Sequence, residues 1–180
     1  MKIVALLTSI AITSSWALPG MAAGSDSDSP QPTNTTKECK NGKVWSDKKN
    51  RCVNPEKSEL DGDKLFGAVR ELAHAGRYSD AQRVLAAMPD QSDDRVMTYW
   101  GFTHRKLGDV DLGMAFYDRA LEINPNNFLA RSYKGQAHIE AGDIVLARIE
   151  LLEIRSRGGV DTWPEQSLAS AIQTGITYNF

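Results

Sequence analysis

The sequence is poor in the residues that build most enzyme sites and metal centres. Its 180 residues include two cysteines and three histidines, and the cysteines lack the Cys-x-x-Cys spacing that is typical of zinc ligands. The sequence also contains no glycine-rich phosphate loop and no nucleophile motif. We therefore predict no catalytic residues, no metal ligands and no cofactor, and we do not expect an enzyme.

An excess of charge of one sign is also absent. Lysine and arginine number 21, aspartate and glutamate number 23, and the formal net charge is −2. A protein whose main partner is nucleic acid carries a basic surface, so we do not expect nucleic acid as a partner. The range 38–53 is locally basic, with five basic and two acidic residues. We interpret it as a solvated surface, with contact to an acidic partner as the alternative.

Long apolar runs are missing except for one near the start of the chain. The run IVALLTSIAI follows Lys2, and small residues including Ala22 and Ala23 come after it. This is the pattern of a secretory signal peptide, and the run is shorter than the ~20 residues that cross a bilayer. We predict a signal peptide at 1–23 and an exported, periplasmic or secreted, protein without stable membrane insertion after cleavage. An N-terminal membrane anchor is the alternative.

The next two segments contrast in composition. Residues 24–37 are polar and rich in Ser, Asp, Pro and Thr, so we predict a disordered tether. Residues 38–54 contain both cysteines, and behind an export signal an even pair is typical of a disulfide between Cys39 and Cys52. The dipeptide Asn-Gly at 41–42 favours a turn. We therefore predict a small two-stranded hairpin clipped by a disulfide.

This stapled hairpin contains one tryptophan. Its spacing Cys-x2-Gly-x2-Trp-x6-Cys resembles the central part of peritrophin-type chitin-binding modules, although the other cysteines of that family are missing. The resemblance implies a possible glycan contact through Trp45. We favour a different role for Trp45, as the core residue of the hairpin.

The remainder of the chain repeats itself. Gly76-Arg77 is followed 32 residues later by Gly108-Asp109 and a further 34 residues later by Gly142-Asp143, and such a period is typical of a helical repeat array. Each glycine is expected to end a helix, and the two aspartates to cap the next one. We predict an all-α fold, a short α-solenoid of about three helical hairpins over 57–161, with a capping helix and tail over 162–180.

One repeat supports a family assignment. The range 94–127 resembles the tetratricopeptide repeat (TPR) family through Trp100, Gly101, Gly108, Tyr117, Ala120 and Pro125. The resemblance implies stacked helical hairpins that present a concave surface to a protein segment. It also fits Gly101 as a position of close helix packing, because this residue lies on the apolar stripe of its helix.

In this family the first helix of each pair lines the concave surface. The resemblance therefore predicts a peptide-binding groove formed by Phe66, Arg70, Thr98, Phe102, Arg105, Ser132 and Gln136. This aromatic and guanidinium surface suits a peptide with apolar anchors and some negative charge. The alternative for Phe102 is that it packs against a neighbouring helix.

These observations lead to three hypotheses about function. The first is an exported TPR-type protein–protein interaction module or scaffold that binds a peptide segment of an envelope partner. The second is attachment to cell wall or polysaccharide through the stapled hairpin, with the repeats as a spacer. The third is a structural protein that self-associates through its terminal helix. We also expect the repeats to fold independently of the stapled hairpin.

Overall fold

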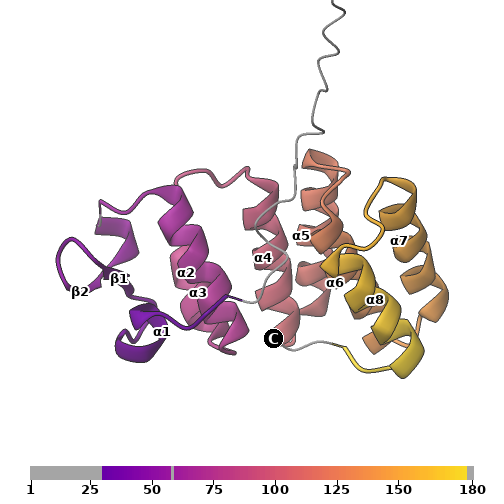
Figure 1. Ribbon diagram of the computed structural model, residues 1–180, viewed down its shortest axis with the longest axis horizontal. Helices are drawn as coiled ribbons and strands as arrows, with labels where there is room; N and C mark the ends of the chain where they lie inside the picture. The colour runs from indigo at the N-terminus through magenta and orange to yellow at the C-terminus, as the bar shows by residue number, and fades with distance from the viewer. Residues whose placement is uncertain (1–29, 58, 178–180) are drawn as a thin grey trace, which may run out of the picture.

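A computed structural model describes residues 30–57 and 59–177 (Figure 1). The predicted signal peptide, 1–23, and the first part of the predicted tether, 24–29, lie outside the described residues. The described elements are α1 Asn34–Glu38, β1 Val44–Ser46, β2 Arg51–Val53, a 3-10 turn Pro55–Lys57, α2 Gly62–His74, α3 Tyr78–Leu85, α4 Asp94–Lys106, α5 Val110–Ile123, α6 Phe128–Glu140, α7 Ile144–Ser156 and α8 Trp163–Thr174.

Consecutive helices pack in pairs, as the period of the sequence predicts. α2 packs against α3, α4 against α5 and α6 against α7, while α8 packs against both α6 and α7. Figure 1 shows the pairs side by side along the long axis of the molecule, with the small hairpin at one end and α7 and α8 at the other. The predicted all-α fold, three helical hairpins with a terminal capping helix, is confirmed.

Each helical hairpin turns at a glycine. Gly76, Gly108 and Gly142 have φ values of 71°, 95° and 85°, in the left-handed region that favours glycine. The recurring glycine therefore marks the turn of each hairpin and accounts for the period of the sequence.

The predicted role of the following aspartates is wrong. Asp109 and Asp143 occupy N-cap positions, but neither side chain accepts a hydrogen bond from its helix. Their ψ values are 70° and 64°, whereas Asp61 and Asp93 have extended backbones, with ψ values of 168° and 126°, and do cap their helices. The side chain reaches the free N–H groups from the extended conformation.

Gly101 brings two helices into close contact. A Cβ atom at Gly101 would lie 2.6 Å from the ring of Tyr117 and 2.9 Å from the carbonyl oxygen of Gly113, both on α5. α4 and α5 therefore cross at a short distance that would not leave room for a side chain at position 101. The prediction that Gly101 is a position of close packing is confirmed.

The stapled hairpin forms as predicted. β1 and β2 pair antiparallel, with Trp45 opposite Cys52, and a disulfide joins Cys39 to Cys52. The core residue is Val44, which is fully buried, and Trp45 is only half-buried. Because side chains alternate along a strand, the burial of Val44 turns Trp45 to the other side of the hairpin. Our interpretation of Trp45 as the core residue is therefore wrong.

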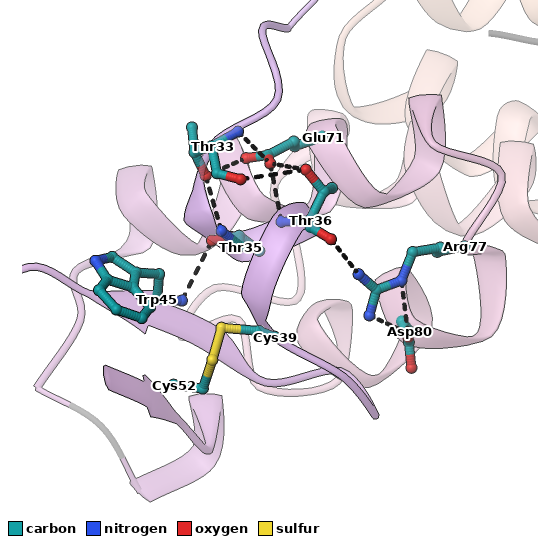
Figure 2. Close-up of a disulfide and its surroundings, with 9 residues drawn as sticks. All are labelled: Thr33, Thr35, Thr36, Cys39, Trp45, Cys52, Glu71, Arg77 and Asp80. Carbon is teal, nitrogen blue, oxygen red and sulfur yellow. Dashed lines mark hydrogen bonds and ion pairs between the residues drawn. A yellow bond between two sulfur atoms is a disulfide. The ribbon is translucent and has the colours of Figure 1, made fainter. Parts of the chain in front are cut away.

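The end of the predicted tether, 24–37, lies in a short helix. Residues 34–38 form α1, which begins against the buried carboxylate of Glu71 on α2 (Figure 2). This carboxylate accepts hydrogen bonds from the backbone N–H groups of Thr33 and Thr36, at 2.6 and 3.1 Å, and from both of their hydroxyls, at 2.7 and 2.6 Å. The carboxylate of Glu71 thus adds four hydrogen bonds from α2 to the local cap that Thr33 provides for α1.

The hairpin is also packed on the first helical pair. Val44 belongs to the same buried apolar cluster as Leu65 and Val69 of α2. Arg77 donates a hydrogen bond to the carbonyl oxygen of Thr36, and it is held by Asp80, as Figure 2 shows. This shared core argues against our expectation that the repeats fold independently of the hairpin.

Candidate functional site

The predicted groove residues lie on the first helices of the three pairs. Phe66 and Arg70 are on α2, Thr98, Phe102 and Arg105 on α4, and Ser132 and Gln136 on α6. Arg70 is half-buried and the other six are buried. Peptide binding by these residues stays a prediction, and their contacts show what each one does within the fold.

The two aromatic members of this set pack against other rings. Phe66 lies edge-on to Tyr99 at 5.5 Å. Phe102 lies 4.8 Å from Tyr133 on α6 and 5.9 Å from Tyr78 on α3, measured between ring centroids. Such pairs stabilise a fold by about 0.5–1.5 kcal/mol beyond the burial of their area. Phe102 therefore packs against neighbouring helices, which was the alternative that the sequence left open.

Two of the polar members, Thr98 and Gln136, connect elements, and Ser132 bonds to Gln136 within α6. Thr98 accepts a hydrogen bond from Asn127 at 2.9 Å and donates one to the carbonyl oxygen of Asp94 at 2.7 Å. Gln136 donates to the hydroxyl of Ser167 on α8 at 3.2 Å, and Ser132 is a further acceptor for Gln136 at 3.4 Å. These bonds hold α6 between α4 and α8, so their first role is structural.

Arg105 differs from the rest of the set. Its side chain is 1% exposed, and its Nη1 lies 3.1 Å from Oε2 of Glu140. Nevertheless, Nε, Nη1 and Nη2 of Arg105 have no hydrogen-bond acceptor of good geometry in the described part of the chain. A guanidinium carries five N–H donors, and most buried polar groups in proteins are hydrogen-bonded. Arg105 is therefore a buried cation with unused donors.

Its surroundings carry an excess of positive charge. Lys106 lies 3.4 Å from the other oxygen of Glu140, so two cations share one carboxylate. Thr177 donates a hydrogen bond of 2.6 Å to the same Oε1. The buried hydroxyl of Tyr117 lies within hydrogen-bonding reach of the Arg105 guanidinium, although the angles are not those of a good hydrogen bond. We call Arg105, Lys106, Tyr117 and Glu140 the Arg105 cluster.

The pKa values of the cluster follow from burial and from these charges. Burial raises the pKa of Tyr117 to about 12, although Arg105 acts in the opposite direction. Burial, followed by the charge of Arg105, lowers the pKa of Lys106. For Glu140, burial favours a higher pKa, but Arg105, Thr177 and Lys106 together outweigh it and lower the pKa. Glu140 is therefore ionised at neutral pH, and the cluster keeps one positive charge in excess.

Sequence reasoning named Arg105 but missed the rest of the cluster. Lys106 is the next residue along the chain, whereas Tyr117 and Glu140 come from α5 and α6. Glu140 lies 34 residues after Lys106, one repeat later, and that equivalence was the available signal. The arrangement can bind an anion that offers two acceptor oxygens, such as a carboxylate.

A pocket lies beside the stapled hairpin. Its lining includes the charged residues Asp47, Lys48, Lys49, Glu59, Asp61 and Lys64. The ion pairs Lys48–Glu59, at 3.1 Å, and Lys64–Asp47, at 2.7 Å, balance these charges within the pocket. Trp45 is not among its lining residues, so the pocket and the proposed glycan contact are separate features.

The histidine His104 lies in a stack of rings. Its ring is 5.7 Å from Trp100 and 5.4 Å from Phe116, with interplanar angles of 27° and 14°. Within the described ranges, no group of three or more His, Cys, Asp or Glu residues is placed to hold a metal ion. Among the helices that the structure describes, none combines the length and the apolar character needed to cross a membrane.

Comparisons of the chain with models of protein families, with curated proteins and with solved structures found no match. The resemblance to tetratricopeptide repeats therefore rests on the residues of the range 94–127 and on the glycine period. The helical hairpins of the structure are compatible with it.

Proposed function

We propose that the protein is an exported, TPR-type interaction module that binds a peptide segment of an envelope partner along the inner side of α2, α4 and α6. The observation that carries this proposal is the guanidinium of Arg105, buried with unused N–H donors. A buried charge is destabilising unless it is paired and hydrogen-bonded. A carboxylate of the bound peptide would supply the missing acceptors and neutralise the excess charge of the Arg105 cluster.

The position of the cluster supports access to it. Glu140 is 38% exposed, and Leu107 and Gly108, which follow Arg105 and Lys106 at the end of α4, are exposed. The cluster is therefore next to solvent on one side. In the proposal, an acidic side chain of an extended or helical peptide enters at this end of α4, and it contacts Arg105 only after Glu140 or the turn after α4 moves, because the Arg105 side chain is 1% exposed.

Export is supported by two independent features. The apolar run near the start of the chain has the pattern of a signal peptide. The disulfide between Cys39 and Cys52 belongs to an oxidising compartment. Both features fit a periplasmic or secreted protein.

The proposal is tested by pairs of peptides that differ in one group. An array of apolar peptides, each with a single Glu or the matching Gln, is screened against the protein, and the strongest Glu peptide is titrated by calorimetry. We expect the Gln form to bind at least about tenfold more weakly, because a hydrogen bond between charged groups contributes about 1.5–3 kcal/mol. Equal affinity of the Glu and Gln forms would contradict the proposal.

A variant of Arg105 separates binding from folding. Arg105→Met removes the guanidinium but fills much of its volume, and Glu140 keeps Lys106 as a cation, so we expect the fold to be retained with a lower thermal midpoint, because one partner of the ion pair is lost. We expect the Glu peptide to lose its advantage over the Gln peptide in this variant. The matched control is Arg119→Met on α5, where the arginine is exposed and pairs with Glu122, and where affinity is expected to stay the same.

A further inference from the structure

The helix α7 is apolar on two sides. Its inner side contributes Ala147, Leu151 and Ile154 to a buried cluster with α8. Its outer side exposes Val145 at 71%, Ile149 at 48% and Leu152 at 63%. A helix that is apolar all round is normally buried all round. The outer stripe of Val145, Ile149 and Leu152 therefore has the composition of an interface, and we call it the α7 stripe.

The stripe is a property of α7 and not of the repeat. The positions 34 residues earlier, in α5, are Asp111, Ala115 and Asp118, and all three are exposed. The repeat pattern therefore places polar or small residues on this outer side. Three large apolar residues at the same positions in α7 are not needed for the stacking of the helical pairs.

The spacing of the stripe is that of a two-stranded seam. Val145, Ile149 and Leu152 are separated by four and three residues, which corresponds to positions d, a and d of a heptad. Within parallel coiled coils, isoleucine at position a together with leucine at position d, as at Ile149 and Leu152, favours two strands over higher oligomers. In this frame Arg148 falls at position g, on one edge of the stripe, and Glu153 at position e, on the other.

We propose that α7 pairs in parallel with α7 of a second copy of the chain, around a two-fold axis that runs along the helices. In a parallel pair opposite edges meet, so Arg148 of each copy faces Glu153 of the other, the usual g-to-e pairing. In an antiparallel pair equal edges meet, and Arg148 of each copy would face Arg148 of the other, whereas Arg155 on the same edge is already paired with Glu165 of its own chain at 2.6 Å. Charge complementarity therefore selects the parallel arrangement.

The seam is short. α7 has 13 residues, a length of about 20 Å, and the interface is smaller than those of permanent dimers. We expect a dimer that dissociates on dilution. This inference is independent of the proposed peptide binding, because the α7 stripe and the Arg105 cluster share no residue.

Sedimentation of the exported, purified protein over a concentration series tests the association. We expect the average mass to rise from that of a monomer towards that of a dimer. We expect Ile149→Lys to remain monomeric, because it places two like charges next to the axis. The control Leu107→Lys changes another exposed apolar residue, 48% exposed and away from α7, and should associate like the native protein. A native protein that stays monomeric, or Ile149→Lys that still associates, overturns the proposal.

A single cysteine tests the direction of the helices. Both native cysteines are used in the Cys39–Cys52 disulfide, so Leu152→Cys introduces the one free thiol. In the parallel pair the two thiols face each other, and mild oxidation should link two chains. In the antiparallel pair they would lie about 10 Å apart along the seam, too far for a disulfide. Failure of Leu152→Cys to link, in a protein that still dimerises, overturns the parallel arrangement.

Charge exchange tests the edges. Arg148→Glu and Glu153→Arg should each weaken self-association about tenfold or more, while a mixture of the two variants should form mixed dimers in which both edge pairs are attractive. Glu153 also pairs with Arg157 and Arg131 of its own chain, at 2.9 and 3.7 Å, so the thermal midpoint of Glu153→Arg is measured in parallel. If the mixed dimer of the two variants is no more stable than the dimer of either variant alone, the proposed pairing of Arg148 with Glu153 is contradicted.

Discussion

At Gly101 a single hydrogen atom in place of a side chain decides how α4 and α5 cross. A methyl group there would meet the ring of Tyr117 at 2.6 Å. We expect Gly101→Ala to lower the free energy of unfolding by about 1–3 kcal/mol, because the core is overpacked. The matched control is Gly67→Ala on α2, where no atom lies within 4 Å of the new Cβ. It should gain up to about 1 kcal/mol from helix propensity. Equal unfolding midpoints in denaturant would contradict this packing.

His74 gives the fold a dependence on pH. Burial, with a smaller contribution from Arg70, lowers its pKa from 6.5 to about 4. Between these values the unfolded chain binds a proton at this histidine and the folded protein does not, so stability is lost as the pH falls from 6.5 towards 4. We expect the thermal midpoint to fall over this window, and to fall less in His74→Gln. The same slope in both proteins would show that His74 is not responsible.

Among the elements, α1 depends most on a contact that is distant in sequence. Glu71 adds to the local cap that the hydroxyl of Thr33 provides for this five-residue helix, and it joins the helix to α2. We expect Glu71→Gln to cost about 1–3 kcal/mol, because the amide offers one acceptor atom where the carboxylate offers two. Hydrogen exchange should become faster at 33–38 and stay unchanged in α7. Unchanged exchange at 33–38 would mean that α1 is held by other contacts, and Glu122→Gln, at an exposed glutamate, serves as the control.

The same contrast explains which elements the sequence could predict. The helical hairpins carry a local signal, a glycine at each turn and an apolar period along each helix, and they form where the sequence placed them. The helix α1 carries no such signal, because its order comes from a carboxylate 38 residues from Thr33. The capping by Asp109 and Asp143 could not be predicted from residue type, since these two aspartates do not cap their helices whereas Asp61, Asp93 and Asn127 do.

At the scale of the whole molecule, the chain is a row of helical pairs with the stapled hairpin packed on its first member. Periodicity could predict that Phe66, Phe102 and Arg105 lie on first helices. It could not predict that the rings fill the space between helices, because burial depends on neighbours from other repeats. The sequence predicted Arg105 as a site residue. It did not predict the rest of the Arg105 cluster, because these partners come from three different helices.

The central claim is that the side of the array near Arg105 receives an acidic peptide of another protein. The most direct measurement places a photoreactive amino acid at Leu107, exposed beside the cluster, and identifies the crosslinked peptide from the native envelope by mass spectrometry. We predict a segment of another protein with Asp or Glu beside apolar residues, and its loss when Arg105→Met is added. A crosslink that persists unchanged with Arg105→Met, or crosslinked segments without any acidic residue, would contradict the claim.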